Sequence, residues 1–170
     1  MTKAILETKN LSMRRVTLDD AKALYESLND ENHLRYVPFK ALKTVEEAQH
    51  FIQKKLLSKQ DYPRVLAICH NKTNEVIGLI AFVDYNKRLN EAEVGYVIHK
   101  DFTNQGYMSE ALSAFIDYGF RFLDLKRIYG KSHPLNLASQ KVMINAGMDF
   151  SETESDYYGQ IEHLVFSVEK

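Results

Sequence analysis

The sequence predicts a mixed α/β fold in which helices cover a mostly antiparallel sheet. Three consecutive strand-like runs (64–69, 75–85 and 92–98) are joined by polar turns, which favours a sequential antiparallel meander. A long amphipathic helix follows from Met108, and two strand-like runs end the chain as a hairpin. At 170 residues the chain suits one domain spanning 1–170, and no linker-like segment divides it.

The N-terminal part is expected to hold one strand and two helices. Residues 11–16 alternate as in a strand, and Asp19 or Asp20 is placed to cap the first helix. The second helix begins at a capping box, in which the Thr44 hydroxyl and the Glu47 carboxylate satisfy each other's exposed backbone amides. The apolar positions recur at helical spacing: Ala21, Leu24, Tyr25 and Leu28, then Val45, Ala48, Ile52 and Leu56.

The second half continues with helix, strand, helix and two strands. In the helix from Met108, the predicted buried stripe is Leu112, Phe115, Ile116, Gly119, Phe122 and Leu123. The remaining predicted elements are a strand at 127–132, a helix at 137–146, and strands at 148–153 and 161–168. Asn136 is placed as the N-cap of the last helix and Gly147 as its C-terminal glycine.

Composition and patterning exclude several function classes. The formal charge is −1, whereas nucleic-acid-binding proteins usually carry an excess of basic residues on one surface. The longest strongly apolar run, 76–83, falls far short of the roughly 18 residues of a membrane span. No signal-peptide core is present, so we expect a cytoplasmic protein without a membrane partner. Cys69 is expected to be a buried strand thiol, and the scattered histidines predict no metal site.

The segment that carries chemical information begins at the turn between the third strand of the meander and the long helix. Residues 102–108 contain one glycine, Gly106, and lead directly into that helix. Such a turn points several unpaired backbone amides at one spot, with the positive end of the helix dipole behind them. This arrangement suits a phosphate or pyrophosphate, although a single glycine before a helix is often only a turn.

Three motifs in register resemble the GCN5-related N-acetyltransferase (GNAT) family, and in particular its branch of ribosomal-protein N-terminal acetyltransferases. Ala92-Glu-Val-Gly-Tyr96 is similar to that branch's fourth strand. Gln105-Gly-Tyr-Met-Ser-Glu-Ala111 resembles its pyrophosphate loop and helix start. Asn136-Leu-Ala-Ser139, followed by Asn145-Ala-Gly-Met148, resembles its last signature. Weaker likeness reaches back to the first predicted strand, so the resemblance covers most of the chain.

The resemblance implies a binding site for acetyl-coenzyme A. The backbone of Tyr96, Val97 and Ile98 would pair with the pantetheine arm, as one strand pairs with another. The pyrophosphate would be held by the backbone amides of Gln105, Gly106, Tyr107, Met108 and Ser109. Asn136 and Ser139 would lie beside the pantetheine and its sulfur, and Asn136 can also cap its helix. Thr103 and Met108 depart from the family's loop pattern, but neither removes a backbone amide.

The resemblance also implies catalytic roles. Many relatives have a tyrosine that acts as the general acid at the position that Met143 occupies here. Methionine cannot donate a proton, so Ser139 is the best remaining donor to the leaving thiolate. Glu93 is the candidate general base, acting through water, and a backbone amide near Val97 would meet the developing oxyanion. A structural reading of Glu93 stays open, because Glu91 and Glu93 alternate on one strand face and would then be simply solvated.

The acceptor implied by the branch is an amine, first of all the N-terminal α-amine of a protein. A polyamine, an amino acid or an aminoglycoside-like drug as acceptor would require the same coenzyme site. A pocket for a polyamine or such a drug should be lined with acidic residues, and Glu31, Glu46 and Glu47 could contribute to it. A non-catalytic acyl-CoA-binding domain is the alternative from another class. The aromatic loop 36–39, His133 and the pair Tyr157-Tyr158 either border the acceptor site or are ordinary loop residues. An exposed sheet edge would allow a homodimer.

Overall fold

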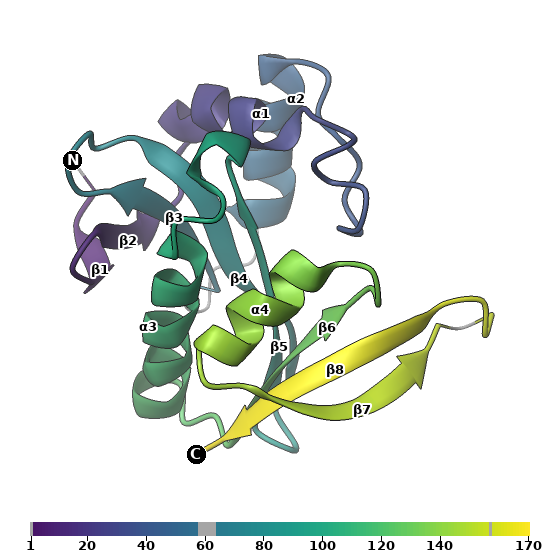
Figure 1. Cartoon of the computed structure of the whole chain (residues 1–170). Helices are drawn as coiled ribbons and strands as arrows, with labels where there is room; N and C mark the ends of the chain where they lie inside the picture. Colours follow the sequence, from purple (N-terminus) through teal and green to yellow (C-terminus); the bar gives the residue numbers. More distant parts are fainter. Residues whose placement is uncertain (1, 58–63, 157) are drawn as a thin grey trace.

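The computed structural model describes residues 2–57, 64–156 and 158–170, and its strands form one eight-stranded sheet in the order β1-β2-β3-β4-β5-β6-β8-β7 (Figure 1). The strands are β1 (Ala4–Glu7), β2 (Leu11–Arg15), β3 (Val65–His70), β4 (Val76–Asn86), β5 (Glu91–Ile98), β6 (Arg127–Ser132), β7 (Asp149–Ser155) and β8 (Glu162–Glu169). Neighbouring strands are antiparallel except for β5 and β6, which are parallel. The predicted mixed α/β class with a mostly antiparallel sheet is confirmed.

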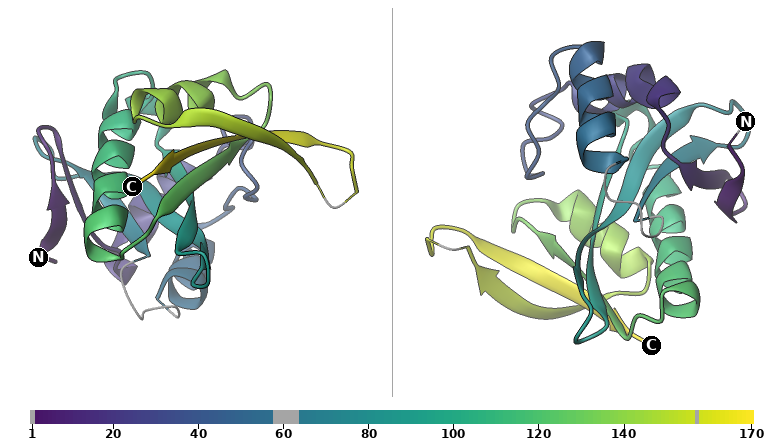
Figure 2. Two further views of the ribbon diagram at one scale, coloured as in Figure 1. Left: turned by 90° about the horizontal axis from the view of Figure 1, so that it is seen from below. Right: turned by 180° about the vertical axis from the view of Figure 1, so that it is seen from behind.

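Four α-helices cover the sheet: α1 (Ala21–Leu28), α2 (Val45–Phe51), α3 (Tyr107–Phe122) and α4 (Leu137–Asn145). Short helical turns at 18–20 and 100–102 precede α1 and α3, and a π-helical turn at 52–56 continues α2. In Figure 1, α3 and α4 lie in front of the sheet, and the view from behind in Figure 2 places α2 on the other side. None of the helices in the described parts of the chain is long and apolar enough to cross a membrane.

Two apolar clusters fill the space on the two faces of the sheet. Leu66 and Ile68 of β3 belong to the cluster under α3, whereas Ala67 between them belongs to the cluster under α1 and α2. This alternation follows from the two-residue period of a strand. Cys69 is buried at the end of β3, as predicted, and burial raises the pKa of its thiol. A sheet buried on both faces can carry a site only where its strands separate or end.

The N-terminal hairpin corrects the expected element order. The sequence analysis placed one strand before the first helix, but β1 also pairs with β2, for example at Leu6 and Met13. The register shifts between Ala4 and Leu6, so the two-residue alternation that marks a strand is interrupted. The short strand therefore leaves no readable pattern.

Two local expectations also need correction. Phe122 is 71% exposed instead of lying in the buried stripe of α3. Leu125 takes the buried place, because the chain turns back at Asp124 (φ 52°) and brings Leu125 against Gly119. Asp20 stands at the cap position of α1, but its carboxylate accepts hydrogen bonds from Arg14 and the Thr17 amide instead of capping the helix.

Candidate functional site

The parallel strands β5 and β6 separate after a short stretch of pairing. Their ladder joins only Glu91, Ala92 and Glu93 to residues 127–129, although β5 continues to Ile98. The other edge of β5 stays paired with β4 through Ile98. In the described parts of the chain, residues 94–98 thus have no ladder on their β6 side. A free strand edge inside a sheet can pair with an extended ligand that carries amide groups.

At Gly78, strand β4 lies very close to the backbone of residues 97–98 in β5. A Cβ atom at Gly78 would clash with the carbonyl oxygen of Val97 and lie 3.1 Å from the Cα of Ile98. Both contacts are with backbone, which a side-chain movement cannot relieve. The absence of a side chain at this position therefore allows the backbone of 97–98 to lie where it does.

The N-terminus of α3 supplies a second set of free backbone groups. Gly106 stands at its cap with φ 81°, makes no side-chain cap, and has open space where a Cβ would lie. The first amides of a helix have no partner within the helix, and here the 16-residue length of α3 places a full helix dipole behind them. This end of α3 is therefore a geometrically suitable anion site.

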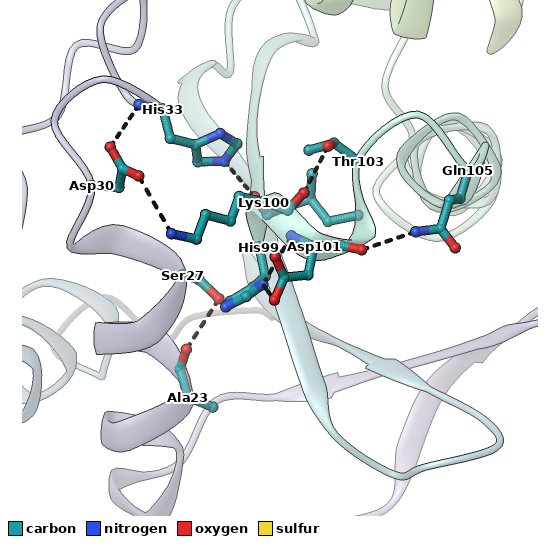
Figure 3. Close-up of polar contacts among 10 residues, drawn as sticks. Ala23, Ser27, Asp30, His33, His99, Lys100, Asp101, Thr103 and Gln105 are labelled. Carbon is teal, nitrogen blue, oxygen red and sulfur yellow. Dashed lines mark hydrogen bonds and ion pairs between the residues drawn. The ribbon is translucent and has the colours of Figure 1, made fainter.

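Side chains of the loop before α3 form hydrogen bonds with carbonyl groups of the same loop. Thr103 Oγ1 donates to the Lys100 carbonyl at 2.7 Å, and Gln105 Nε2 donates to the Asp101 carbonyl at 2.9 Å (Figure 3). The departure from the family pattern at Thr103 thus has a local structural use. The Gln105 side chain thereby braces the loop whose backbone amides face the ligand in the predicted site.

The first turn of α3 is fixed from behind. The Tyr107 hydroxyl lies 3.2 Å from Nε2 of the buried His70, and the Glu110 carboxylate accepts hydrogen bonds from Thr8 and from the Asn10 amide. Met108 is buried in the core. Among the predicted coenzyme residues, Tyr107 and Met108 therefore point their side chains into packing and offer backbone groups alone.

Helix α4 approaches the free edge of β5 from the β6 side. Asn136 Oδ1 accepts the Ser139 amide at 3.2 Å, so the predicted N-cap is present. The Tyr96 hydroxyl lies 2.9 Å from Ser139 Oγ and 3.2 Å from the Ser139 carbonyl oxygen. Burial raises the pKa of Tyr96 to about 12. The Tyr96 side chain was missed by the sequence analysis, which assigned this residue a backbone role only.

Strand β5 divides the polar groups of the site between two faces. Val94 and Tyr96 pack with the cluster under α3, and Val97 packs with the cluster on the other face. Alternation along the strand places Glu93 on the same face as Val97, opposite Tyr96 and Ser139. The two predicted catalytic residues, Glu93 and Ser139, therefore approach the free edge from opposite sides of the sheet.

Glu93 is not simply a solvated carboxylate. Its side chain is 21% exposed and lies 3.8 Å from Lys131 Nζ, while Glu91 pairs with Arg127 at 3.3 Å. Burial raises the pKa of Glu93, Lys131 opposes this rise, and the charges of Asp84 and Glu154 add to it. A carboxylate with a raised pKa is a stronger base at neutral pH than an ordinary one.

The loop between α1 and α2 contacts residues on both sides of the separation between β5 and β6. His33 Nε2 lies 2.7 Å from the Ile98 carbonyl oxygen, and Asp30 pairs with Lys100 at 3.6 Å (Figure 3). On the β6 side, the Tyr36 ring stacks on His133 with centroids 4.8 Å apart. Both residues had been left open between a site role and a loop role, and the structure brings them together.

Other candidate residues have ordinary partners. Glu31 pairs with Lys43 at 2.7 Å, and Glu47 accepts the Lys43 amide. Glu46 and Glu47 line a surface hollow along α2. Tyr158 is 78% exposed, and Tyr157 lies outside the described residues. No group of three His, Cys, Asp or Glu side chains suited to a metal ion occurs in the part of the chain that the structure describes.

Comparison with known proteins identifies the class to which this fold and site belong. Residues 10–149 match the family described as acetyltransferase (GNAT) domain. The chain is 33% identical over 143 residues to the N-acetyltransferase YnaD of Bacillus subtilis (strain 168), covering 84% of this chain and 81% of YnaD. The chain therefore belongs to the GNAT family, and it is an N-acetyltransferase, as the resemblance implied.

Relatives that act on ribosomal proteins are also found. The ribosomal-protein-serine acetyltransferase of Escherichia coli (strain K12) is 26% identical over 153 residues, covering 86% of this chain and 83% of the relative. The structure of RimL, a ribosomal alpha-N-protein acetyltransferase in complex with coenzyme A, superposes with a TM-score of 0.84 at 21% identity over 98% of each chain. The second likeness confirms the GNAT fold.

Proposed function

We propose that this enzyme transfers the acetyl group of acetyl-coenzyme A to the N-terminal α-amine of a protein, with residues 1–170 forming one catalytic domain. The observation that carries the coenzyme half of the proposal is the free edge of β5 ending beside the N-terminus of α3. An extended amide-bearing arm and a pyrophosphate are the two parts of coenzyme A that these features suit.

The residues present fit that ligand. The backbone of Tyr96, Val97 and Ile98 would pair with the pantetheine amides, and the amides of residues 105–109 would hold the pyrophosphate. The Ile98 carbonyl already accepts from His33, so a pantetheine amide would share it through its second lone pair. Asn136 Oδ1 is used in capping, which leaves the Asn136 amino group to donate to the ligand.

The placement of Glu93 and Ser139 on opposite faces suits transfer across the free edge. Glu93 would remove the proton of the attacking amine from one side, and the Ser139 hydroxyl would donate to the departing thiolate on the other. A backbone amide near Val97 would stabilise the oxyanion between them. Glu93 would then act on the attacking amine and Ser139 on the leaving thiolate, and the two side chains would not occupy the same space.

The acceptor follows from amine chemistry and from the relatives. An α-amine with a pKa of about 7.7–8.0 is partly neutral at pH 7, whereas a lysine with a pKa of about 10.4 is almost wholly charged. A single carboxylate base therefore suffices more readily for the α-amine. RimL and the Escherichia coli relative are both named for action on ribosomal proteins, which supports a protein acceptor.

Calorimetric titration with acetyl-coenzyme A tests the coenzyme half. Gly106→Glu places a carboxylate at the anion site, so micromolar binding by the wild type should be lost. Gly159→Glu is the matched control, because Gly159 also has a positive φ (64°) and open space but lies in the β7–β8 turn. Absence of binding by the wild type, or equal loss in both variants, would count against this site.

An acceptor panel tests the other half. Peptides with free and with blocked N-termini, polyamines, free amino acids and an aminoglycoside should be compared with saturating acetyl-coenzyme A. Transfer restricted to the free peptide N-terminus supports the proposal. Turnover of a polyamine, amino acid or drug in preference to every peptide would replace the protein acceptor by the small-molecule alternative.

A further inference from the structure

The hydroxyl groups of Tyr96 and Ser139 form a pair that joins β5 to α4 across the separation of β5 and β6. Tyr96 Oη lies 2.9 Å from Ser139 Oγ and 3.2 Å from the Ser139 carbonyl oxygen. A phenol carries a single hydrogen, so Tyr96 can donate to only one of these two oxygens at a time. The pair therefore has two hydrogen-bonding arrangements, and they differ in where the Ser139 hydrogen points.

In the first arrangement Tyr96 donates to the carbonyl and Ser139 donates to Tyr96. The Ser139 hydrogen is then used inside the pair and is not available to a ligand. In the second arrangement Tyr96 donates to Ser139 Oγ, and the Ser139 hydrogen is free to point outward. Rotation of two hydroxyl groups interconverts them without moving the backbone.

Rotation to the second arrangement leaves no buried group unsatisfied. A carbonyl inside an α-helix accepts the amide four residues further on, and Ser139 lies in the first turn of α4. Its carbonyl therefore keeps a partner when Tyr96 turns away. An anion facing Ser139 favours the second arrangement, because a chain of hydroxyl groups donating toward a negative charge is strengthened along its length.

We infer that Tyr96 is a positioning residue, whose hydroxyl orients the Ser139 hydroxyl toward the leaving thiolate of acetyl-coenzyme A. This inference rests on the proposed function, in which Ser139 is the donor. The raised pKa of Tyr96, about 12, agrees with it, because a tyrosine that stays protonated throughout the working pH range always retains the hydrogen it must donate.

The role differs from that of a structural tyrosine in how it depends on Ser139. Tyr96→Phe keeps the ring and removes only the hydroxyl. If Tyr96 acts through Ser139, this change lowers kcat about 10-fold in the wild type but has little effect once Ser139 is alanine. A residue that only supports the fold would lower activity by the same factor in both backgrounds.

The experiment is a double-mutant cycle of Tyr96→Phe and Ser139→Ala with an acceptor that the wild type acetylates. We expect unchanged acetyl-coenzyme A affinity by calorimetry, a loss in kcat without a rise in KM for the coenzyme, and non-additive effects. Tyr118→Phe is the control, because Tyr118 is another tyrosine packed in the same apolar cluster but lies on α3. Additive losses, or no loss in Tyr96→Phe, would overturn the inference.

The outcomes also separate this inference from the proposed function. If the wild type neither binds acetyl-coenzyme A nor transfers acetyl groups, the proposed function itself fails. If the wild type is active and Ser139→Ala is fully active, the donor role of Ser139 fails, and the role of Tyr96 fails with it. If Ser139→Ala is impaired and Tyr96→Phe is not, only the inference about Tyr96 is wrong.

Discussion

The sulfur of Met143 lies where a side chain at Gly130 would begin: a Cβ atom added to Gly130 would stand 2.6 Å from Met143 Sδ. The Met143 side chain of α4 thus fills the space beside β6 that a side chain at position 130 would need. Met143 is 1% exposed and belongs to the cluster under α3. Met143 is therefore a core position of α4, whereas Ser139 on the same helix faces Tyr96.

Gly130→Ala should force the buried Met143 side chain of α4 to shift and thereby disturb the contact between Ser139 and Tyr96. Overpacking of this kind costs about 1–3 kcal/mol of unfolding free energy. We expect a lower denaturation midpoint together with reduced kcat. Met143→Ala in the same chain makes room for the added methyl group, so the double variant should be more stable than the sum of the single effects predicts. Strict additivity in urea unfolding would contradict the packing described.

The pH dependence of turnover should report Glu93. Burial raises the pKa of this carboxyl and the charge of Lys131 lowers it. A base must be deprotonated, so activity should fall as the pH drops through a value above the ordinary glutamate pKa. Lys131→Met removes the opposing charge and should move this acidic limb of kcat to higher pH.

Glu93→Gln should lower kcat about 100-fold or more, the usual contribution of a general base. Glu91→Gln is the matched control, because Glu91 lies on the same face of β5 and also pairs with a cation of β6, Arg127. Equal losses in the two variants would show that Glu93 is needed only as an ion-pair partner.

The stack of Tyr36 on His133 should affect the acceptor and not the coenzyme. Tyr36→Ala removes a ring contact worth about 0.5–1.5 kcal/mol, so the acceptor KM should rise up to about 10-fold. Tyr36→Phe retains the ring and should behave as the wild type. Calorimetry with acetyl-coenzyme A checks specificity: a matching loss of coenzyme affinity would mean that the loop supports the whole site rather than its acceptor side.

Stability should depend on pH through Asp20. Burial alone would raise the pKa of this carboxyl, but hydrogen bonds from Arg14 and the Thr17 amide hold it below its ordinary value. A carboxyl whose pKa is lowered by folding stabilises the protein above its unfolded pKa, and this contribution disappears as the pH falls through the folded value.

Asp20→Asn should therefore lower the unfolding free energy near pH 7, by about 3 kcal/mol for a buried ion pair that loses one partner. The difference from the wild type should shrink as the pH falls below the ordinary aspartate pKa. Urea unfolding at a series of pH values measures this. Asp19→Asn is the control, and a difference for Asp20→Asn that does not change with pH would contradict the assignment.

Local chemistry explains why much of the fold was predictable. The Thr44 hydroxyl accepts the Glu47 amide as expected, although the Glu47 carboxylate accepts the Lys43 amide instead of the Thr44 amide. The predicted strand 127–132 coincides with β6. The turn expected before the long helix is present, and Gly106 stands at the N-cap of α3 with a positive φ. Helix caps, turns and strand alternation depend on interactions over a few residues, so the local sequence is enough to predict them.

The site itself was foreseen only in part. The roles of Glu93, Asn136, Ser139 and residues 96–98 and 105–109 were assigned through resemblance, and their places on β5 and at the N-terminal ends of α3 and α4 are compatible with those roles. The Tyr96 side chain was missed because its partner, Ser139, is 43 residues away in the chain. Val94 and Tyr96 share a face of β5 in the structure, but no local sequence pattern identifies which residue covers Tyr96.

The sequence by itself determined most of the helices and strands, although not β1, and it determined which family motifs lie along the chain. Only the tertiary structure decided that β5 and β6 part after Glu93, that Glu93 and Ser139 approach the free edge from opposite faces, and that Met143 is packed in the core. The physical reason is the range of the interactions. Capping and alternation depend on neighbours along the chain, whereas strand separation and side-chain pairing depend on how distant elements pack.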